Sequence, residues 1–142
     1  MILERLVNQL KIDEGFRSIP YMDSVGVWTI GYGTTHVNGY KVDKNWKAVD
    51  KSIAEKWLFY HLPDSINQAK SFVNNFAKLT HQQQEALVNM AYQLGSRQSQ
   101  FIKARIAIQN NLSDRAYREL LNSKWARQTP SRAKRIAVAF LE

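Results

Sequence analysis

Apolar residues at the start of the chain recur at the spacing of a helix. Four of them lie three or four positions apart and predict one apolar stripe, formed by Leu3, Leu6, Val7 and Leu10. Glu14 follows Leu10 by four residues, so its carboxyl continues this stripe instead of joining the polar face. Gly15 is a typical helix terminator. The pattern therefore predicts a first helix whose last turn directs an acidic side chain toward the protein.

Two short segments after this helix have the composition of β-strands. Residues 17–21 and 27–32 are rich in aromatic and β-branched side chains. The residues between them, Asp23-Ser24-Val25-Gly26, are of a type that favours a turn. A second turn is predicted at Asn38-Gly39. We therefore expect a small β-rich lobe over about residues 15–46.

A helical connection is expected after this lobe. Ser52 and Glu55 have the spacing of a capping box, and the helix they open continues to about residue 73. Pro63 should break or kink this segment, because proline lacks a backbone donor and clashes with the preceding turn. We interpret residues 52–73 as the segment that joins two lobes.

The rest of the chain has the pattern of a helical lobe. Thr80 with Gln83 caps a helix that Gly95 ends, and apolar residues cover most of its circumference, as in a buried central helix. A further helix begins at residues 112–114. Another is predicted to have Thr129 as its cap and Pro130 at its first position.

These elements predict the fold class. Residues 1–14 and about 75–142 form the helical lobe of one domain that spans residues 1–142. The fold is expected to be α+β and mostly helical, with two lobes. Ligand sites commonly lie where such lobes meet, so we expect the active-site cleft at their junction.

Three side chains in the first 30 residues have catalytic potential. Glycoside hydrolysis requires two carboxyl groups on either side of one sugar bond, and Glu14 and Asp23 supply two carboxyls close in sequence. Asp13 stands beside Glu14 in the last helical turn, where the helix dipole and mutual repulsion disfavour ionisation. A raised pKa of that kind suits a general acid. Thr29 adds a hydroxyl on the following strand.

Each of these residues also has a structural explanation. A glutamate in the position of Glu14 is more commonly an ordinary charged residue at a frayed helix end. Aspartates in the position of Asp23 usually cap a turn, and strand threonines such as Thr29 are usually present for their β propensity. No single residue decides between the two interpretations.

The order and spacing of these residues resemble a known family. Residues 13–15 read Asp-Glu-Gly, residues 21–23 read Tyr-Met-Asp, and residues 26–33 read Gly-Val-Trp-Thr-Ile-Gly-Tyr-Gly. Together they are very similar to the catalytic signature of the phage T4-type lysozymes, a family of muramidases. Residues 86–95 resemble the central buried helix of that family, and residues 123–135 resemble its C-terminal helices. The resemblance extends over roughly residues 3–140.

The resemblance implies a role for each catalytic residue. Glu14 would be the general acid, Asp23 would hold or activate the hydrolytic water, and Thr29 would hydrogen-bond that water from the other side. The family inverts the anomeric configuration, so the two carboxyl groups should be on the order of 6.5–9.5 Å apart. The bond cleaved would be the β-1,4 bond between N-acetylmuramic acid and N-acetylglucosamine in peptidoglycan. No cofactor or metal ion is expected.

Further residues are expected to contact the substrate by the same resemblance. They are Thr35, Tyr92, Gln93, Lys124 and Arg132. The last of them falls where the family places an arginine beside the catalytic glutamate, and such a cation would lower the pKa of the acid.

Some positions depart from the family pattern. The family commonly has a histidine directly after the residue matching Gly33, whereas this chain has Thr34 there and a histidine at His36. Where the best-known relative has a serine and an asparagine in contact with substrate, this chain has Ala104 and Glu119.

The charge of the chain adds an expected partner. The chain has a formal charge of +8, and residues 101–142 carry nine Lys or Arg against three acids. A basic surface is attracted to polyanions such as the bacterial envelope. Nucleic acid is also anionic, but the sequence has no nucleic-acid-binding motif, so we expect none to bind. We expect a monomer.

The remaining expectations concern location and alternative functions. The absence of cysteine is compatible with a reducing cytoplasm, and residues 1–10 lack the apolar core of a signal peptide. We therefore expect a phage endolysin made in the host bacterial cytoplasm, which acts on the periplasmic wall after release. Two alternatives remain open: a catalytically weak wall-binding or tail-associated module, and a protein whose basic C-terminal helix disrupts membranes.

Overall fold

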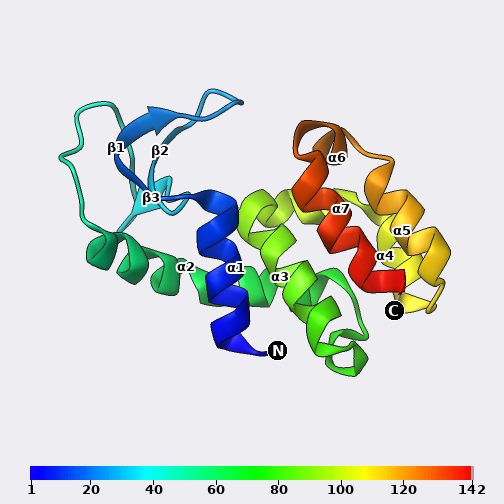
Figure 1. The fold of residues 1–142 in the computed structure, drawn as a ribbon. Coiled ribbons are helices and arrows are strands. Elements are labelled where there is room, and N and C mark those ends of the chain that lie inside the picture. Colours follow the sequence, from blue (N-terminus) through cyan, green and yellow to red (C-terminus); the bar gives the residue numbers. More distant parts are fainter. Residues whose placement is uncertain (142) are drawn as a thin grey trace. The chain divides into compact units, whose positions relative to one another are not determined.

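The computed structural model describes residues 1–141 and confirms a mostly helical α+β fold (Figure 1). Two small antiparallel sheets are formed by β1 (Arg17–Met22) with β2 (Trp28–Gly31), and by β3 (His36–Val37) with β4 (Tyr40–Lys41). The α-helices are α1 (Leu3–Glu14), α2 (Lys51–Phe72), α3 (His81–Leu94), α4 (Ile102–Gln109), α5 (Ser113–Leu121), α6 (Lys124–Gln128) and α7 (Pro130–Val138). Short 3-10 helices are η1 (Phe76–Lys78), η2 (Gly95–Gln100) and η3 (Ala139–Leu141).

The described chain divides into two compact units. The hairpin unit consists of residues 7–63 and contains both sheets. The helical unit consists of residues 1–6 together with residues 64 onward, and contains α3 to α7. The unit boundaries fall within α1 and within α2.

The strands of the hairpin unit form where their composition predicts them. In the β1–β2 pair, Tyr21 lies opposite Thr29 and Met22 lies opposite Trp28. The turn between β3 and β4 has Asn38 at φ 53° and Gly39 at φ 81°, as a two-residue hairpin turn requires. The predicted turn at this dipeptide is therefore confirmed.

The sheet of the hairpin unit is packed closely against α2. A Cβ atom on Gly31 would stand 3.0 Å from the Cβ of Ala54, so the strand can approach the helix only because this residue is glycine. Leu10, Ile30 and Leu58 are completely buried and come from α1, β2 and α2 respectively. The hairpin is thus fixed to two helices by a shared apolar core.

Helix α2 differs from its prediction in two ways. It is one helix of 22 residues that continues through Pro63, so of the predicted break or kink, a break does not occur. Leu62 and Ala69, on either side of the proline, are buried, and their packing offsets the backbone bond that proline cannot make. The cap is also different: the Ile53 N–H donates to Asp50 Oδ1 at 2.9 Å, so Asp50 and not Ser52 starts the helix.

The helical unit is built around α3. The predicted capping box is confirmed, because the Gln83 N–H donates to Thr80 Oγ1 at 3.1 Å and the glutamine side chain bonds back to Thr80. Residues 85–91 of α3 are all buried, and α7 and η3 both contact this helix. Gly95 ends the helix at φ 55°.

The buried carboxylate of Glu85 on α3 forms a salt bridge with Arg5 near the start of the chain. Arg5 donates two hydrogen bonds of 2.6 Å to the Glu85 carboxylate, one to each oxygen. Burial alone would raise the pKa of Glu85, but the bonds from Arg5 and from the Ile2 N–H lower it by more. The carboxylate therefore stays ionised in its buried position.

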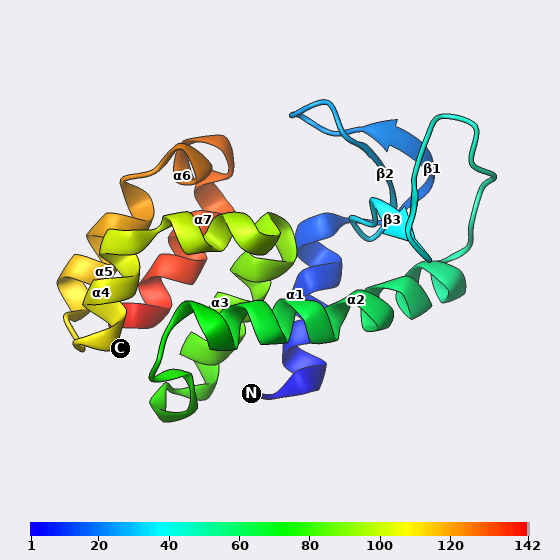
Figure 2. The same cartoon turned by 180° about the vertical axis from the view of Figure 1, so that it is seen from behind.

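The C-terminal helices place their apolar residues in the core. Ile136 and Phe140 are buried, and α5 lies beside α7 in both views of the ribbon (Figures 1 and 2). Pro130 occupies the first turn of α7 as predicted. Thr129 precedes it, but its hydroxyl donates to the Trp125 carbonyl at 3.1 Å and does not cap the helix. Within residues 1–141, no helix has the length and apolar character needed to cross a membrane.

The helix-capping assignment in α2 can be tested by two substitutions. Asp50→Ala should lower the free energy of unfolding by about 1 kcal/mol, because it removes the acceptor for the Ile53 N–H. Ser52→Ala should leave stability unchanged or raise it slightly, because alanine is the better helix former. Urea denaturation of both variants measures the difference, and the reverse order would restore Ser52 as the cap.

Candidate active site

Glu14 lies at the last position of α1, with its carboxyl against the backbone of Gly33. A Cβ atom on Gly33 would stand 2.5 Å from Glu14 Oε1 and 2.9 Å from its Cδ, which is closer than any side chain tolerates. Gly33 also has a φ of 76°, a backbone conformation that favours glycine. Gly15 ends the helix at φ 67°, as predicted. The acid is therefore held between a helix end and a hairpin turn.

Asp23 and Thr29 are held by one shared residue, Val27. The Val27 N–H donates to Asp23 Oδ1 at 2.8 Å, and the Val27 carbonyl accepts from the Asp23 N–H at 3.0 Å. The same carbonyl accepts from Thr29 Oγ1 at 3.0 Å. The Val25 N–H donates a further bond of 3.0 Å to Asp23 Oδ1. The carboxylate and the hydroxyl are thus fixed relative to one another by the turn.

These hydrogen bonds leave one oxygen of each side chain, Asp23 and Thr29, able to accept a further hydrogen bond. All the turn donors to the Asp23 side chain go to Oδ1, so its second oxygen is available to accept a proton or a hydrogen bond. Thr29 is buried and its hydroxyl donates its hydrogen bond to the Val27 carbonyl, so toward other groups its oxygen acts as an acceptor. A water that donates to both oxygens would keep a lone pair for nucleophilic attack.

Tyr21 is a member of this cluster that sequence reasoning did not assign. It pairs with Thr29 across the β1–β2 sheet, and the Arg17 guanidinium lies 4.7 Å from the centre of its ring. Burial raises the pKa of the Tyr21 phenol most, and the charge of Glu14 raises it further. Arg17 lowers this pKa, and Asp23 raises it by less than Arg17 lowers it. Both carboxylates are therefore close enough to act on one phenol, which stays protonated.

The position that departs from the family pattern is buried. Thr34 bridges to Ile30 by two backbone bonds of 2.9 Å, and its side chain is almost inaccessible. His36 is exposed on β3, with Thr35 Oγ1 at 3.0 Å from its Nδ1. Because Thr34 is buried and His36 is exposed, the histidine does not occupy the place of Thr34. Thr35, expected to contact substrate, is half-buried in the hairpin unit.

The other expected substrate contacts belong to the helical unit. Tyr92 and Gln93 lie on α3, Lys124 on α6 and Arg132 on α7. Trp125 Nε1 donates to Gln93 Oε1 at 2.9 Å, which directs the amide nitrogen of Gln93 away from the indole.

Arg132 is hydrogen-bonded to Asn89, a buried residue of α3. Its Nε donates to the side-chain oxygen of Asn89 at 2.8 Å, and a second guanidinium nitrogen lies 3.3 Å from the Asn89 carbonyl. Asn89 is 3% exposed, so the guanidinium is anchored on the core of the helical unit.

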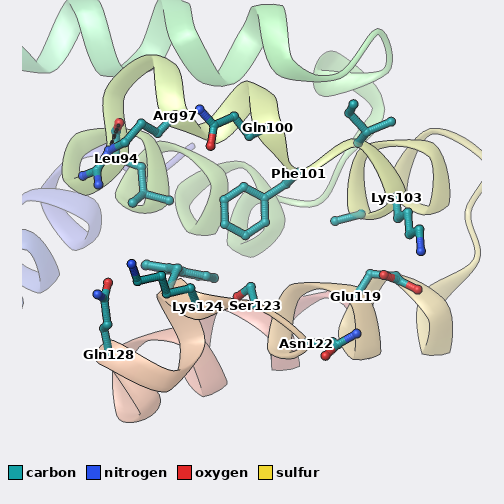
Figure 3. Close-up of a pocket in the computed structure, with 13 residues that line it drawn as sticks. Leu94, Arg97, Gln100, Phe101, Lys103, Glu119, Asn122, Ser123, Lys124 and Gln128 are labelled. Carbon is teal, nitrogen blue, oxygen red and sulfur yellow. Dashed lines mark hydrogen bonds between the residues drawn. The ribbon is translucent and has the colours of Figure 1, made fainter.

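A cavity of about 490 Å³ opens within the helical unit (Figure 3). It is lined by residues from the end of α3 to α6, among them Arg97, Phe101, Lys103, Ala104, Glu119, Lys124 and Trp125. Ala104 and Glu119, at which the sequence departs from the resemblance, both line this cavity. Among residues 1–141, no group of three or more His, Asp or Glu side chains is placed to hold a metal ion.

Together, a mostly helical α+β fold and a hairpin that holds a carboxylate near a helix-end acid define a glycoside hydrolase of lysozyme type. The model of the phage lysozyme family matches residues 11–136. A relative from Dictyostelium discoideum, described as probable T4-type lysozyme 2, is 28% identical, and the match covers 98% of this chain and 95% of the relative. The chain belongs to the phage lysozyme family, and it is a peptidoglycan-directed glycoside hydrolase.

The contact between Glu14 and Gly33 predicts a selective defect. Gly33→Ala should cost about 1–2 kcal/mol of stability through its left-handed φ. Its Cβ should also displace the Glu14 carboxyl and lower peptidoglycan cleavage by about tenfold or more. The measurements are wall lysis and thermal unfolding.

Gly39→Ala is the matched control. Its φ is 81° and no atom lies within 4 Å of the added Cβ, so it should lose similar stability and keep its activity. Equal activity in the two variants would mean that the carboxyl position does not depend on Gly33.

Proposed function

We propose that this enzyme is a muramidase that cleaves the β-1,4 bond between N-acetylmuramic acid and N-acetylglucosamine with inversion. The observation that carries the proposal is the shared anchoring of Asp23 and Thr29 on Val27, in the same unit as Glu14. An acid, a separately held carboxylate and an acceptor hydroxyl are the groups that an inverting reaction uses. Family membership supports the substrate class.

Each residue then has one task. Glu14 donates its proton to the glycosidic oxygen as the bond between that oxygen and the anomeric carbon breaks. A water that donates hydrogen bonds to Asp23 and Thr29 attacks the anomeric carbon from the opposite face. Asp23 takes the proton that the water loses, and exchange with solvent returns both carboxyl groups to their starting states.

The helical unit supplies the proposed substrate contacts. Gln93 offers its amide nitrogen as a donor, because its oxygen already accepts from Trp125. Tyr92, Lys124 and Arg132 add hydrogen-bonding and positively charged groups, and Thr35 adds a hydroxyl from the hairpin unit. Their donors suit the acetamido, hydroxyl and carboxylate oxygens of peptidoglycan.

We place this activity in a phage endolysin that acts as a monomer, is made in the host cytoplasm and reaches the wall after release. The family description names phage lysozymes, whereas the Dictyostelium relative has another source, so membership alone does not assign the host. The basic character of residues 101–142 supports attraction to an anionic envelope. The burial of Ile136 and Phe140 in the core argues against a membrane-inserting C-terminal helix.

Glu14→Gln should abolish cleavage of purified peptidoglycan while the protein stays folded, because the amide keeps the shape of the acid but has no proton to give. Glu4→Gln is the matched control: it makes the same substitution at an exposed position in the first turn of α1, and it should keep most activity. Turbidity clearing and thermal melting check both variants. A Glu14→Gln protein with near-native activity would remove the acid from the mechanism.

Thr29→Val should lower turnover by more than tenfold, about 1.4 kcal/mol of transition-state stabilisation, with little change in melting temperature. Thr29→Ser should keep more activity, because it retains the hydroxyl. A threonine needed only for strand propensity would show the opposite order, with valine fully active and serine less stable. Kinetic and melting measurements on both variants separate these cases.

Wall hydrolysis should fall as ionic strength rises from about 0.01 to above 0.15 M, because the Debye length contracts from roughly 30 to 8 Å. The charge-reversed variant Arg118→Glu/Arg127→Glu, at two exposed positions, should show a weaker salt dependence. Binding to intact walls should change more than turnover on soluble fragments. A flat salt profile on intact walls would exclude electrostatic attraction.

A further inference from the structure

An irregular register in the β1–β2 sheet places Tyr21 beside Thr29. Between the pair that contains Arg17 and the pair of Tyr21 with Thr29, the chain advances from residue 17 to 21 in β1 but only from 31 to 29 in β2. A regular antiparallel ladder from the first pair would instead put Ile19 opposite Thr29. Pro20 lies within the irregular stretch and has no N–H to donate to a ladder. The irregularity therefore gives Thr29 a phenol as its neighbour in place of an aliphatic side chain.

The ring of Tyr21 is held by the protein, but its hydroxyl is not. The Arg17 guanidinium lies 4.7 Å from the centre of the ring, and the tyrosine is half-buried. Among residues 1–141, no hydrogen bond uses the Tyr21 hydroxyl. A tyrosine that loses part of its hydration usually finds a hydrogen-bond partner for its O–H. The hydroxyl is therefore available to donate a hydrogen bond to a ligand.

The charges near Tyr21 limit the kind of group that its hydroxyl can bind. Burial and the charges of Glu14 and Asp23 raise the pKa of the phenol, so it stays protonated and can donate. Arg17 opposes this effect by less than Glu14 contributes. A carboxylate near the hydroxyl also repels an anionic group that approaches it. The group that accepts from Tyr21 is therefore an uncharged oxygen.

The length of the tyrosine side chain decides which part of the reaction it can reach. Residues directly opposite in an antiparallel pair project to the same face of the sheet, so Tyr21 and Thr29 stand side by side. Strand side chains stand roughly perpendicular to the sheet, and a tyrosine extends farther from it than a threonine does. A water held by Thr29 separates this threonine from the sugar that the water attacks. The Tyr21 hydroxyl therefore reaches the level of the sugar, beyond the water.

We propose that the Tyr21 hydroxyl donates a hydrogen bond to an uncharged oxygen of the sugar whose anomeric carbon the water attacks. The inference rests on the proposed function, which supplies the water and its place beside Thr29. The sugars of peptidoglycan offer acetamido and hydroxyl oxygens as acceptors. Tyr21 is a substrate-binding residue that exchanges no proton in the reaction. Its hydrogen bond holds the sugar in place for attack by the water that Asp23 and Thr29 bind.

Removal of this hydroxyl tests the contact. Tyr21→Phe keeps the ring on which the Arg17 guanidinium lies, so the melting temperature should change little. On soluble glycan fragments of peptidoglycan, kcat/KM should fall about three- to tenfold, as expected for the loss of one hydrogen bond between uncharged groups. Tyr40→Phe is the matched control, because it removes the same group at an exposed position of β4 and should leave kcat/KM unchanged.

Binding to an inactive enzyme distinguishes a substrate contact from an effect on the carboxyl groups. In the Glu14→Gln background, Tyr21→Phe should raise the dissociation constant of the same fragments by a similar factor, measured by calorimetry. If this increase disappears on fragments whose acetamido groups have been removed, the acceptor is the acetamido carbonyl. If the increase persists on those fragments, the acceptor is a sugar hydroxyl.

Two results would overturn the inference. One is an unchanged kcat/KM in Tyr21→Phe. The other is a lower kcat/KM with an unchanged dissociation constant, which would mean that the phenol acts on the catalytic groups and not on the sugar. In both cases, cleavage by the wild-type enzyme would continue to support the muramidase assignment. If the wild-type enzyme cleaved none of the fragments, the proposed function itself would fail, and the inference about Tyr21 with it.

Discussion

The contact between the Glu14 carboxyl and the backbone of Gly33 is the constraint on which the site depends. A carboxyl at a helix end is usually free to move, but here a hairpin turn stands against it with no space for even a methyl group. The strand that precedes this turn packs closely on α2, because Gly31 lies against Ala54. The salt bridge of 3.3 Å between Lys11 and Glu55 joins the two helices directly. The core of the hairpin unit therefore fixes where the acid can be.

The residues to which we assign the chemistry also stabilise the fold. Asp23 accepts two turn bonds through one oxygen, as an ordinary turn aspartate does, and its other oxygen accepts none of these bonds, which suits the role we propose for it. The Thr29 hydroxyl donates a hydrogen bond to the Val27 carbonyl, and its oxygen can still accept one. The structural and catalytic explanations of these residues are therefore compatible, because each side chain divides its hydrogen-bonding capacity between the two tasks.

Local signals in the sequence predicted those features that depend on neighbouring residues alone. The capping box of Thr80 and Gln83 and the turn at Asn38-Gly39 formed as expected, because spacing and backbone preference determine them. Asp50 was missed as the cap of α2, since Ser52 offers an equally good local pattern. A break at Pro63 does not occur because burial of its neighbours stabilises the helix, and burial is a property of the folded chain.

The chemical class of the enzyme was predictable from the sequence, but the geometry of the candidate site was not. The spacing of Glu14, Asp23 and Thr29 pointed to glycosidase chemistry, and family membership supports that class. The role of Val27 was hidden, because its contribution comes from backbone groups that every residue possesses. The charged cavity was also hidden, because its wall combines residues from η2, α4, α5 and α6.

The configuration of the newly released reducing end tests the central claim most directly. If Glu14 acts as acid while Asp23 and Thr29 hold the attacking water, NMR recorded during the first turnovers should show the inverted α anomer before mutarotation. Initial release of the β anomer would mean that a carboxylate attacks the sugar itself, and would contradict the assignment of Asp23 as the residue that holds the water.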